Sequence, residues 1–481
     1  MTTRALPTSA PAAQGVAASG IHGFLDALEA APGIEPHSLM ILRHDHVVAA
    51  GWWAPYGPGR VHHLYSLSKS FTATAAAFAV AEGLIRLDDP VISYFPELDA
   101  DITDPRSRAM LVRHVASMAA GHVAEALDGA RALDPEDLVR GFLLLPPDRD
   151  PGTVFAYSQP TTYTLGAIIQ RVTGQSLTEY LRPRLLDPLD IGEVAWTRDR
   201  SGRELGFSGL HATTDAIARL GQLYLRDGVW EGERVLPEGW VAEATRAHIT
   251  TADGTPEGAL SDWQQGYGLQ FWRSRHGYRG DGAYGQFCLV LPEYDAVVAM
   301  TSQSTDMHKV TDLVWEHLLP AFGAEPPHGR REEDAALAGR LAALALPPVP
   351  GAPVPPERAQ AWSGAEFAPD EEARANLWGE ARVRVSATGS DWRVTLVEDG
   401  HRLELPLGEG DWAVVDEPVP VAVGGGWTDV ETLVVEVAFL ETPHRLAVSC
   451  SLKDRTFTAR WRTRPLQPAP LRSTRAPRGS V

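Results

Sequence analysis

An apolar run from Ala73 to Ala81 is rich in alanine, contains no proline and ends at Glu82-Gly83. These features predict a helix with almost no polar face, which must therefore be buried on all sides. The stretch leading into it, residues 64–72, places Ser66 and Lys69 three positions apart, on one face of the first turn. A hydroxyl beside an amine at a helix N-terminus suggests an activated serine nucleophile. The alternative is an N-cap serine followed by an ordinary first-turn lysine.

The pattern around this helix predicts strands before it, helices after it and strands again further on. Residues 38–50 are typical of a β-hairpin, and residues 88–150 predict helices broken by Asp-Pro turns. One sheet is then assembled from both ends of the region, an α+β arrangement of an antiparallel sheet with an all-helical subdomain. The remaining predicted elements are helices at 162–172, 216–225 and 309–318, strands at 267–272, 287–291 and 296–300, and a Gly-rich turn at 276–286.

Beyond residue 325 the pattern changes to a helix, a proline-rich spacer and then strict two-residue alternation. The alternation predicts a separate all-β domain, a small barrel or sandwich. The strongest alternating segments are 382–385, 392–396, 403–405, 433–437 and 457–461. We therefore expect a flexible N-terminus (1–15), a first domain (16–325), a helix and Pro-rich linker (326–358), an all-β domain (359–466) and a disordered tail (467–481).

The composition of the chain indicates which partners it can bind and in which cellular compartment it is expected. A chain of 481 residues suggests at least two domains, and its net charge of −19 argues against nucleic acid and anionic membrane as partners. No secretory signal precedes the first domain, and no apolar run approaches the roughly 20 residues that span a bilayer. The two cysteines, Cys288 and Cys450, fit buried thiols in a reducing compartment. A soluble, cytoplasmic protein is expected.

Three sequence blocks in the first domain carry a resemblance to a known superfamily. Ser66-Leu67-Ser68-Lys69 fits a Ser-x-x-Lys motif, Tyr157-Ser158-Gln159 fits a Tyr-Ser-Asn motif, and the Gly-rich turn before Phe287 lies where a Lys-Thr-Gly or His-Thr-Gly strand is expected. Over residues 14–322 the chain resembles the serine β-lactamase and penicillin-binding-protein superfamily. More narrowly, it is similar to the class C-like esterases, D-aminopeptidases and nylon-oligomer hydrolases. By pattern alone, the carboxy-terminal domain resembles lipocalin-like accessory domains.

Acyl transfer needs a nucleophile, a base for its proton and donors for the developing oxyanion. Ser66 is the expected nucleophile, and its own backbone N–H can supply one oxyanion donor. The second donor is expected at Ala283 or a neighbour, because glycines there permit close approach of the backbone. Lys69 acts as the base only if its pKa falls, and Tyr157 is the alternative proton shuttle, so the sequence leaves the base open.

The other residues predicted to bind substrate depart from the pattern of this superfamily. Gln159 replaces the usual asparagine, which puts recognition of a β-lactam or peptide in doubt. Gly280-Asp281-Gly282 stands where the superfamily has Lys-Thr-Gly, with Arg279 and His276 as possible cationic substitutes. Gln286 is a further candidate at the end of the same turn. Without the carboxylate-binding lysine, β-lactamase activity is disfavoured.

The sequence therefore predicts a serine hydrolase that forms an acyl-enzyme on Ser66 and acts as an esterase or amidase on small or D-configured substrates. The first alternative is an acyltransferase or peptide cyclase of the same fold, in which an amine or alcohol replaces water. A non-catalytic binding module is a less favoured alternative of another class. No cofactor is expected, and no metal, because His62-His63 has no third ligand at a diagnostic spacing. The expected partner is a small-molecule or peptide substrate.

Overall fold

The computed structural model describes residues 4–323, 331–389, 391–407 and 410–478. These residues fall into two compact units. The first unit contains residues 4–51 and 64–342, and the second contains residues 52–63 and 343–478. The described helices include none that combines the length and the apolar character needed to cross a bilayer.

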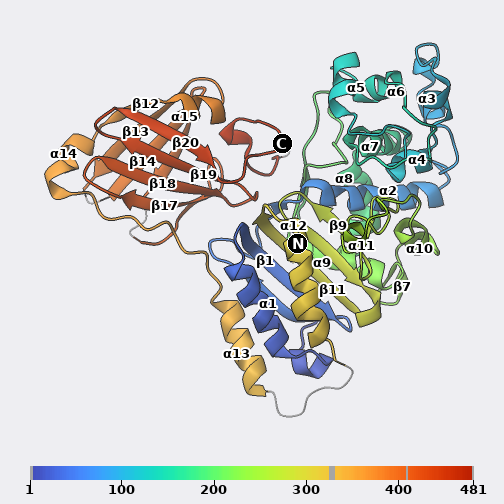
Figure 1. Cartoon of the computed structure of the whole chain (residues 1–481), viewed down its shortest axis with the longest axis horizontal. Helices are drawn as coiled ribbons and strands as arrows, with labels where there is room; N and C mark the ends of the chain where they lie inside the picture. Colours follow the sequence, from blue (N-terminus) through green and yellow to red (C-terminus); the bar gives the residue numbers. More distant parts are fainter. Residues whose placement is uncertain (1–3, 324–330, 390, 408–409, 479–481) are drawn as a thin grey trace. The chain divides into compact units, whose positions relative to one another are not determined.

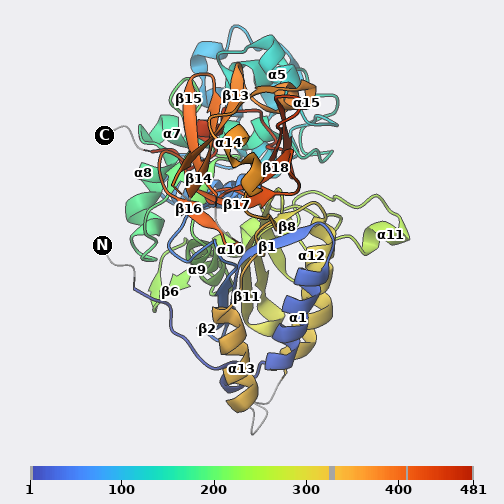
Figure 2. The ribbon, with the colours of Figure 1, turned by 90° about the vertical axis from the view of Figure 1, so that its left-hand side faces the viewer.

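A six-stranded sheet forms the centre of the first unit, in the order β2-β1-β11-β10-β9-β8. The pairs β1–β11, β11–β10, β10–β9 and β9–β8 are antiparallel, so the sheet does combine strands from both ends of the region. Figure 2 shows helix α9 on one face of this sheet and helices α1 and α12 on the other. The strands are β1 (Ile34–Arg43), β2 (His46–Trp52), β8 (Trp272–Arg273), β9 (Tyr278–Gly282), β10 (Gln286–Leu291) and β11 (Ala296–Ser304).

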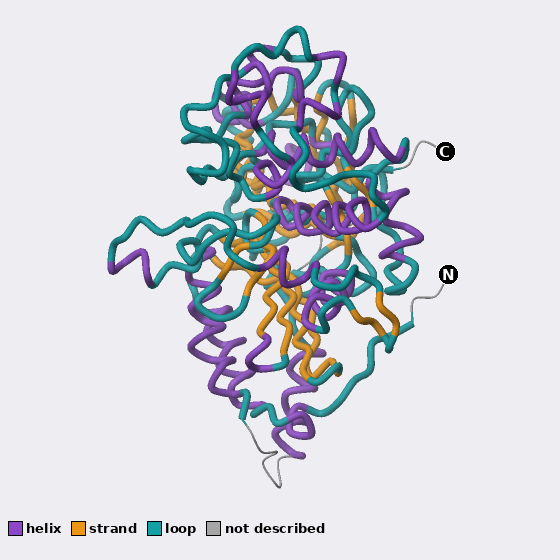
Figure 3. The backbone as a smooth tube through the Cα atoms, turned by 90° about the vertical axis from the view of Figure 1, so that its right-hand side faces the viewer, coloured by secondary structure: helices purple, strands orange, loops and turns teal. Residues whose placement is uncertain are grey.

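Helices make up most of the rest of the first unit, and those from α3 to α8 form a group on one side of α2 (Figure 1). Helix α2 is buried along nearly its whole length, as its all-apolar sequence predicts, and it packs on α7. The loop that carries α11 projects from the unit (Figures 2 and 3). The helices are α1 (Ala18–Ala30), α2 (Ser68–Ala81), α3 (Pro105–Ala109), α4 (Val112–Ala116), α5 (Leu127–Leu133), α6 (Leu138–Leu144), α7 (Gln159–Thr173), α8 (Leu177–Leu181), α9 (Thr214–Leu225), α10 (Trp240–Thr245), α11 (Pro256–Ala259), α12 (Met307–Leu313) and α13 (Arg331–Ala342). Short strand pairs are β4 (Ala195–Trp196) with β5 (Leu210–Ala212), and β6 (Val229–Trp230) with β7 (Glu233–Arg234).

Two local predictions in this unit need correction. The strand predicted at 267–272 is mostly a loop, because Gln270 has a left-handed φ of 63° that an extended strand does not allow. Its backbone N–H donates instead to the carbonyl of Ala116. Conversely, the Gly-rich stretch predicted as a turn contains strand β9, which is flanked by a bend at residues 275–277 and a turn at residues 283–285.

A nine-stranded, nearly closed barrel-like sheet forms the second unit, in the order β15-β14-β13-β12-β20-β19-β18-β17-β16. Among the described strands of this sheet, β12 and β20 pair in parallel, whereas the other neighbouring strands pair antiparallel. Alternate residues such as Val383, Val385 and Val394 point into its apolar core, so the predicted all-β domain is confirmed. The elements are β3 (His62–His63), α14 (Ala359–Trp362), β12 (Glu366–Pro369), α15 (Glu371–Asn376), β13 (Ala381–Thr388), β14 (Asp391–Glu398), β15 (His401–Pro406), β16 (Ala413–Val415), β17 (Val421–Trp427), β18 (Thr432–Phe439), β19 (Arg445–Ser451) and β20 (Thr456–Trp461).

Two segments of the second unit lie outside residues 359–466, the predicted all-β domain. Residues 52–63 belong to the second unit, where Ala54 exchanges backbone hydrogen bonds with Leu344 and Leu346 and His63 donates to the carbonyl of Glu441. The tail, predicted as disordered from residue 467, places Leu471 in the core of the barrel. Burial of this one apolar side chain anchors a segment that is otherwise rich in proline and arginine.

Candidate active site

Ser66 lies in a 3-10 turn, Tyr65–Leu67, that runs directly into helix α2. Lys69 is the second residue of α2, and its Nζ donates a hydrogen bond of 3.0 Å to Oγ of Ser66. Tyr65, immediately before the serine, has a left-handed φ of 48°, which is strained for a residue with a side chain. The two residues of the Ser-x-x-Lys motif are therefore in direct contact, at the end of a constrained turn.

Lys69 is buried, with 1% of its surface exposed, and its ammonium has two further acceptors. Nζ donates to Oε1 of Gln159 at 2.7 Å and to the backbone carbonyl of Phe207 at 2.9 Å. Burial lowers the pKa of Lys69 to about 7, although the carboxylates of Glu125 and Asp281 act to raise it. About half of the Lys69 amines are thus neutral at neutral pH, as a general base requires.

Tyr157 approaches the same serine from the other side, through a side-chain hydrogen bond with Ser66. Nζ of Lys69 lies 4.8 Å from the centre of the Tyr157 ring, which stacks on Trp272 at 5.3 Å and 14°. Burial raises the pKa of Tyr157 above its ordinary value, and the bond to Ser66 offsets this only in part. The Tyr157 hydroxyl therefore stays protonated near neutral pH and can donate a proton, while Lys69 is the group that can accept one.

Strand β9 passes directly beside the turn that holds Ser66. A Cβ atom added at Gly282 would lie 2.0 Å from the carbonyl oxygen of Leu64 and 3.1 Å from the backbone nitrogen of Leu67. One added at Gly280 would lie 2.3 Å from Oγ of Ser70. Because a Cβ atom at Gly282 would meet fixed backbone, only glycine allows this approach there, whereas at Gly280 the side chains of Leu67 and Ser70 would have to move. Ala283, the expected second oxyanion donor, follows directly on Gly282 at the end of the strand.

Residues 23–322 match the model of the family described as Beta-lactamase. The chain belongs to this family. The similar proteins named below are called hydrolases or a penicillin-binding protein, and the fold of the first unit is the β-lactamase and transpeptidase fold. The chain is thus a hydrolytic enzyme of this family.

Three of the proteins that the chain is similar to cover between 56% and 62% of its length. The 6-aminohexanoate-dimer hydrolase of Paenarthrobacter ureafaciens is 29% identical over 289 residues, which are 56% of this chain and 73% of that protein. Penicillin-binding protein 4 of Amycolatopsis lactamdurans is 26% identical over 316 residues, or 57% of this chain and 82% of that protein. The solved structure of EstCE1, a hydrolase with promiscuous acyltransferase activity, superposes with a TM-score of 0.51 at 18% identity. It covers 62% of this chain and 98% of that one.

Two of the residues predicted to bind substrate, Arg279 and Asp281, form an ion pair with one another. Arg279, which is fully buried, donates through Nε to Asp281 at 2.9 Å and through NH1 to Ser274 Oγ and the carbonyl of Asp262. Its guanidinium also lies 4.2 Å from the ring centre of Trp263. Arg279 thus fixes the Asp281 carboxylate, and burial raises the pKa of that carboxyl while Arg279 lowers it.

Gln286 and His276 likewise lie in structural positions. The Gln286 amide donates to the carbonyls of Ala283 and Ser302, which fastens the turn after β9. His276 packs on Trp315 at 5.1 Å between ring centres. Their predicted part in substrate binding stays a prediction. Within the described part of the chain, no group of three His, Cys, Asp or Glu side chains could hold a metal ion.

Glu125 is a site residue that sequence reasoning missed. Both of its carboxylate oxygens accept from the backbone N–H of Gln159, at 3.1 and 3.2 Å, and Oε1 also accepts from Oγ of Ser158. Glu125 lies in a loop between α4 and α5, outside every motif, and only the tertiary fold brings it to the start of α7. No local sequence signal distinguishes it from other loop glutamates.

Proposed function

We propose that this chain is a serine hydrolase that forms an acyl-enzyme on Ser66 and acts as an esterase or amidase on small or D-configured substrates. The observation that carries the proposal is the contact of Ser66 Oγ with a buried lysine whose pKa falls to about 7. A lysine at its ordinary pKa holds its proton at neutral pH and activates nothing. Lowered to about 7, it supplies the neutral amine that a hydroxyl nucleophile needs.

Acylation then runs as a balanced proton transfer. The neutral amine of Lys69 takes the hydroxyl proton of Ser66 while Oγ forms a bond to the substrate carbonyl carbon. The C=O electron pair moves onto oxygen, where the backbone N–H of Ser66 and the end of β9 supply donors. As the tetrahedral intermediate collapses, the leaving oxygen or nitrogen receives a proton from Tyr157, which regains one from the Lys69 ammonium. Water, deprotonated by Lys69, releases the acyl group by the reverse route.

The residues around the serine support small ester or amide substrates. The Gln159 carbonyl oxygen is taken by Lys69, so its NH2 group is the part left to donate to a substrate carbonyl. Beyond it lies a wall of aromatic rings, formed by Tyr157, Tyr267 and Trp272, which favours an apolar acyl or leaving group. The relative named as a 6-aminohexanoate-dimer hydrolase supports a small amide among the substrates.

Covalent labelling tests the nucleophile. A fluorophosphonate should add the mass of one phosphonyl group to the wild type and none to Ser66→Ala. Ser70→Ala is the matched control, because Ser70 lies one turn further along α2 and its Oγ is bonded to the carbonyl of Gln270. The control variant should label as the wild type does. An unlabelled wild type, or a labelled Ser66→Ala, would contradict the proposal.

The acyl acceptor is tested by a second experiment. EstCE1, whose fold the first unit shares, is described as a hydrolase with promiscuous acyltransferase activity, which supports including amines and alcohols as acceptors. Turnover of p-nitrophenyl esters, D-amino-acid amides and nitrocefin should be measured with and without an added amine. We expect hydrolysis of esters or amides and slow nitrocefin turnover. If the amide or ester product exceeds the free acid at millimolar amine, the enzyme is a transferase.

A further inference from the structure

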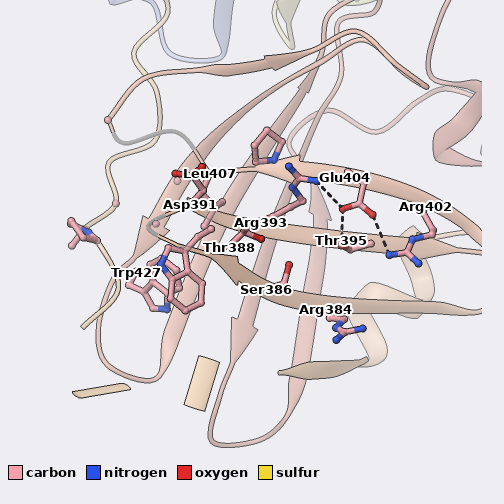
Figure 4. A pocket seen from close by; sticks show the side chains of 18 residues that line it. Arg384, Ser386, Thr388, Asp391, Arg393, Thr395, Arg402, Glu404, Leu407 and Trp427 are labelled. Carbon is pink, nitrogen blue, oxygen red and sulfur yellow. Dashed lines mark hydrogen bonds and ion pairs between the residues drawn. The ribbon is translucent and has the colours of Figure 1, made fainter. Parts of the chain in front are cut away.

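A cavity of about 1060 Å³ lies in the second unit, along strands β13, β14 and β15. Its polar side chains on these strands come from the sheet face opposite the apolar core (Figure 4), whereas Trp392 and Trp427, which line one end of it, pack with the core. The strand register places them in rows across the three strands: Arg384 pairs with Thr395, which pairs with Glu404, and Ser386 pairs with Arg393. The core residues at alternate positions leave this face free for polar groups.

Arg384 is the cation of this cavity whose charge is not already balanced. The carboxylate of Glu404 contacts Arg402 at 3.2 Å and Arg393 at 4.0 Å, and it also accepts from Oγ1 of Thr395. Among the residues that the structure describes, Arg384 makes no such ion pair or hydrogen bond, and Figure 4 shows it apart from the bonded group. In a chain of net charge −19, an unpaired arginine beside hydroxyl groups marks a place for an anion.

A pair of tryptophans closes the other end of the cavity. The rings of Trp392 and Trp427 meet edge to face, with centres 5.0 Å apart. Trp427 is 4% exposed, and its Nε1 has no hydrogen-bond partner within the described ranges. Buried N–H groups are rarely left unsatisfied, so this one indicates a missing acceptor.

Beside Trp427, the wall of the cavity is formed by backbone atoms of residues 351–352 and 425–426. Residue 352 bridges to Trp427 through two backbone hydrogen bonds of 3.0 Å, and a Cβ atom at Gly351 would lie 2.2 Å from the nitrogen of Gly426. Glycines here let two segments approach without side chains that would fill the space. Along β13, Ser386 and Thr388 continue the line of Arg384 toward this end, over a span of about 13 Å.

We propose that this cavity binds a small organic carboxylate with an aromatic body, of the size of a short peptide or an N-acylated amino acid. The carboxylate pairs with Arg384, the hydroxyls of Ser386 and Thr388 donate to its polar middle, and the aromatic group packs on the partly exposed ring of Trp392, which Trp427 supports from the core. A lone phosphate or sulfate would satisfy only the arginine. The two tryptophans therefore favour a ligand that also has an aromatic group.

The test is isothermal titration calorimetry on full-length Ser66→Ala, which prevents turnover. The probes are N-acetyl-phenylalanylglycine and its C-terminal amide, which lacks the negative charge. The acid should bind about tenfold more tightly than the amide, the order expected for a charge-assisted hydrogen bond. Arg384→Gln should abolish this difference, and Trp392→Leu should weaken both probes. Arg382→Gln is the matched control, since Arg382 lies on the same strand and face but does not line the cavity.

Three results would overturn the inference: no binding of the acid, equal binding of acid and amide, or an Arg384→Gln variant that binds as tightly as Ser66→Ala alone. A second titration uses wild-type protein whose Ser66 carries the phosphonyl group. Binding should persist there, because the cavity lies in the other unit, and its loss would mean that the peptide occupies the active site. The binding result does not depend on whether Ser66 proves to be the nucleophile.

Discussion

At the scale of single residues, the chemistry depends on how much of Lys69 is deprotonated. Its pKa of about 7 means that the neutral amine increases with pH across neutrality. The rate constant for phosphonylation of Ser66 should therefore rise with pH, with a midpoint near 7, and level off above it. A rate independent of pH between 6 and 8 would exclude Lys69 as the base.

A substitution at Glu125 should shift the midpoint of the pH profile of Ser66 phosphonylation. Its negative charge acts to raise the pKa of Lys69, so Glu125→Gln should lower the pKa and move the midpoint of the pH profile below that of the wild type. Glutamine can still accept from the backbone N–H of Gln159, which separates the loss of charge from the loss of the hydrogen bond. A lower rate with an unchanged midpoint would show that Glu125 acts only by holding Gln159.

Lys69 also influences stability in a direction that can be calculated. Its pKa is near 7 in the folded chain and about 10.5 in the unfolded chain, so between these values the unfolded state binds more protons. The free energy of unfolding of the wild type therefore gains about 2 kcal/mol from this group between pH 7 and pH 9. Lys69→Met removes this contribution. In urea unfolding, the free energy of unfolding of wild type should rise by about 2 kcal/mol from pH 7 to pH 9, and that of the variant should lack this rise.

Sequence reasoning reached the residues of the site whose type and spacing form a motif. Ser66, Lys69 and Tyr157 each belong to one of the three blocks, and the structure brings the three side chains together. Glu125 and the carbonyl of Phe207 could not be found in this way, because any loop residue can supply a carboxylate or a carbonyl. Their role arises from packing between segments far apart in the chain.

At the scale of elements, strand β9 shows why glycines mislead a prediction. A Gly-rich stretch predicts a turn, because glycine weakens a strand, yet here the glycines allow the strand to approach α2. The predicted strand at 267–272 fails for the opposite reason. Its apolar pattern is that of a strand, but its backbone is held by distant carbonyls such as that of Ala116. Neither contact is visible in local sequence.

A matched pair of glycine substitutions tests the close approach. Gly282→Ala places a methyl group against the Leu64 carbonyl and should destabilise the protein by about 1–3 kcal/mol. Labelling of Ser66 should slow on the order of 100-fold, since the turn must move. Gly339→Ala, within the exposed part of α13 where nothing lies near its Cβ, should instead stabilise by roughly 0.5–1 kcal/mol. Thermal unfolding and labelling rates measure both, and equal effects would rule out this account of Gly282.

At the scale of the whole molecule, the division into units does not follow the order of the sequence. Residues 52–63 end just before the turn that holds Ser66, yet they belong to the second unit, whose other residues begin at 343. Sequence patterns predicted the two domains because each has its own periodicity. They could not assign a short segment such as 52–63, whose partners are backbone groups.

Deleting residues 343–481 should therefore impair the active site in the first unit. The truncated chain loses the backbone partners of Ala54 and His63 that lie beyond residue 343, so the segment that leads into Ser66 is held less firmly. Phosphonylation of Ser66 should slow on the order of 100-fold. A chain with a protease site inserted after Val349 is the control: once cut, it keeps both pieces and should label at the uncut rate. Full labelling of the truncated chain would show that 52–63 does not position the serine.

The place of residues 52–63 also sets an order of events during synthesis of the protein. The ribosome makes His63 and Ser66 early, but the second unit, which holds His63, begins about 280 residues later. At 5–20 residues per second this is a delay of roughly 14–56 s. Throughout that interval Ala54 and His63 lack the backbone partners that residues 344, 346 and 441 later supply. The segment that leads into the nucleophile thus reaches its full set of backbone contacts only after the second unit has been made.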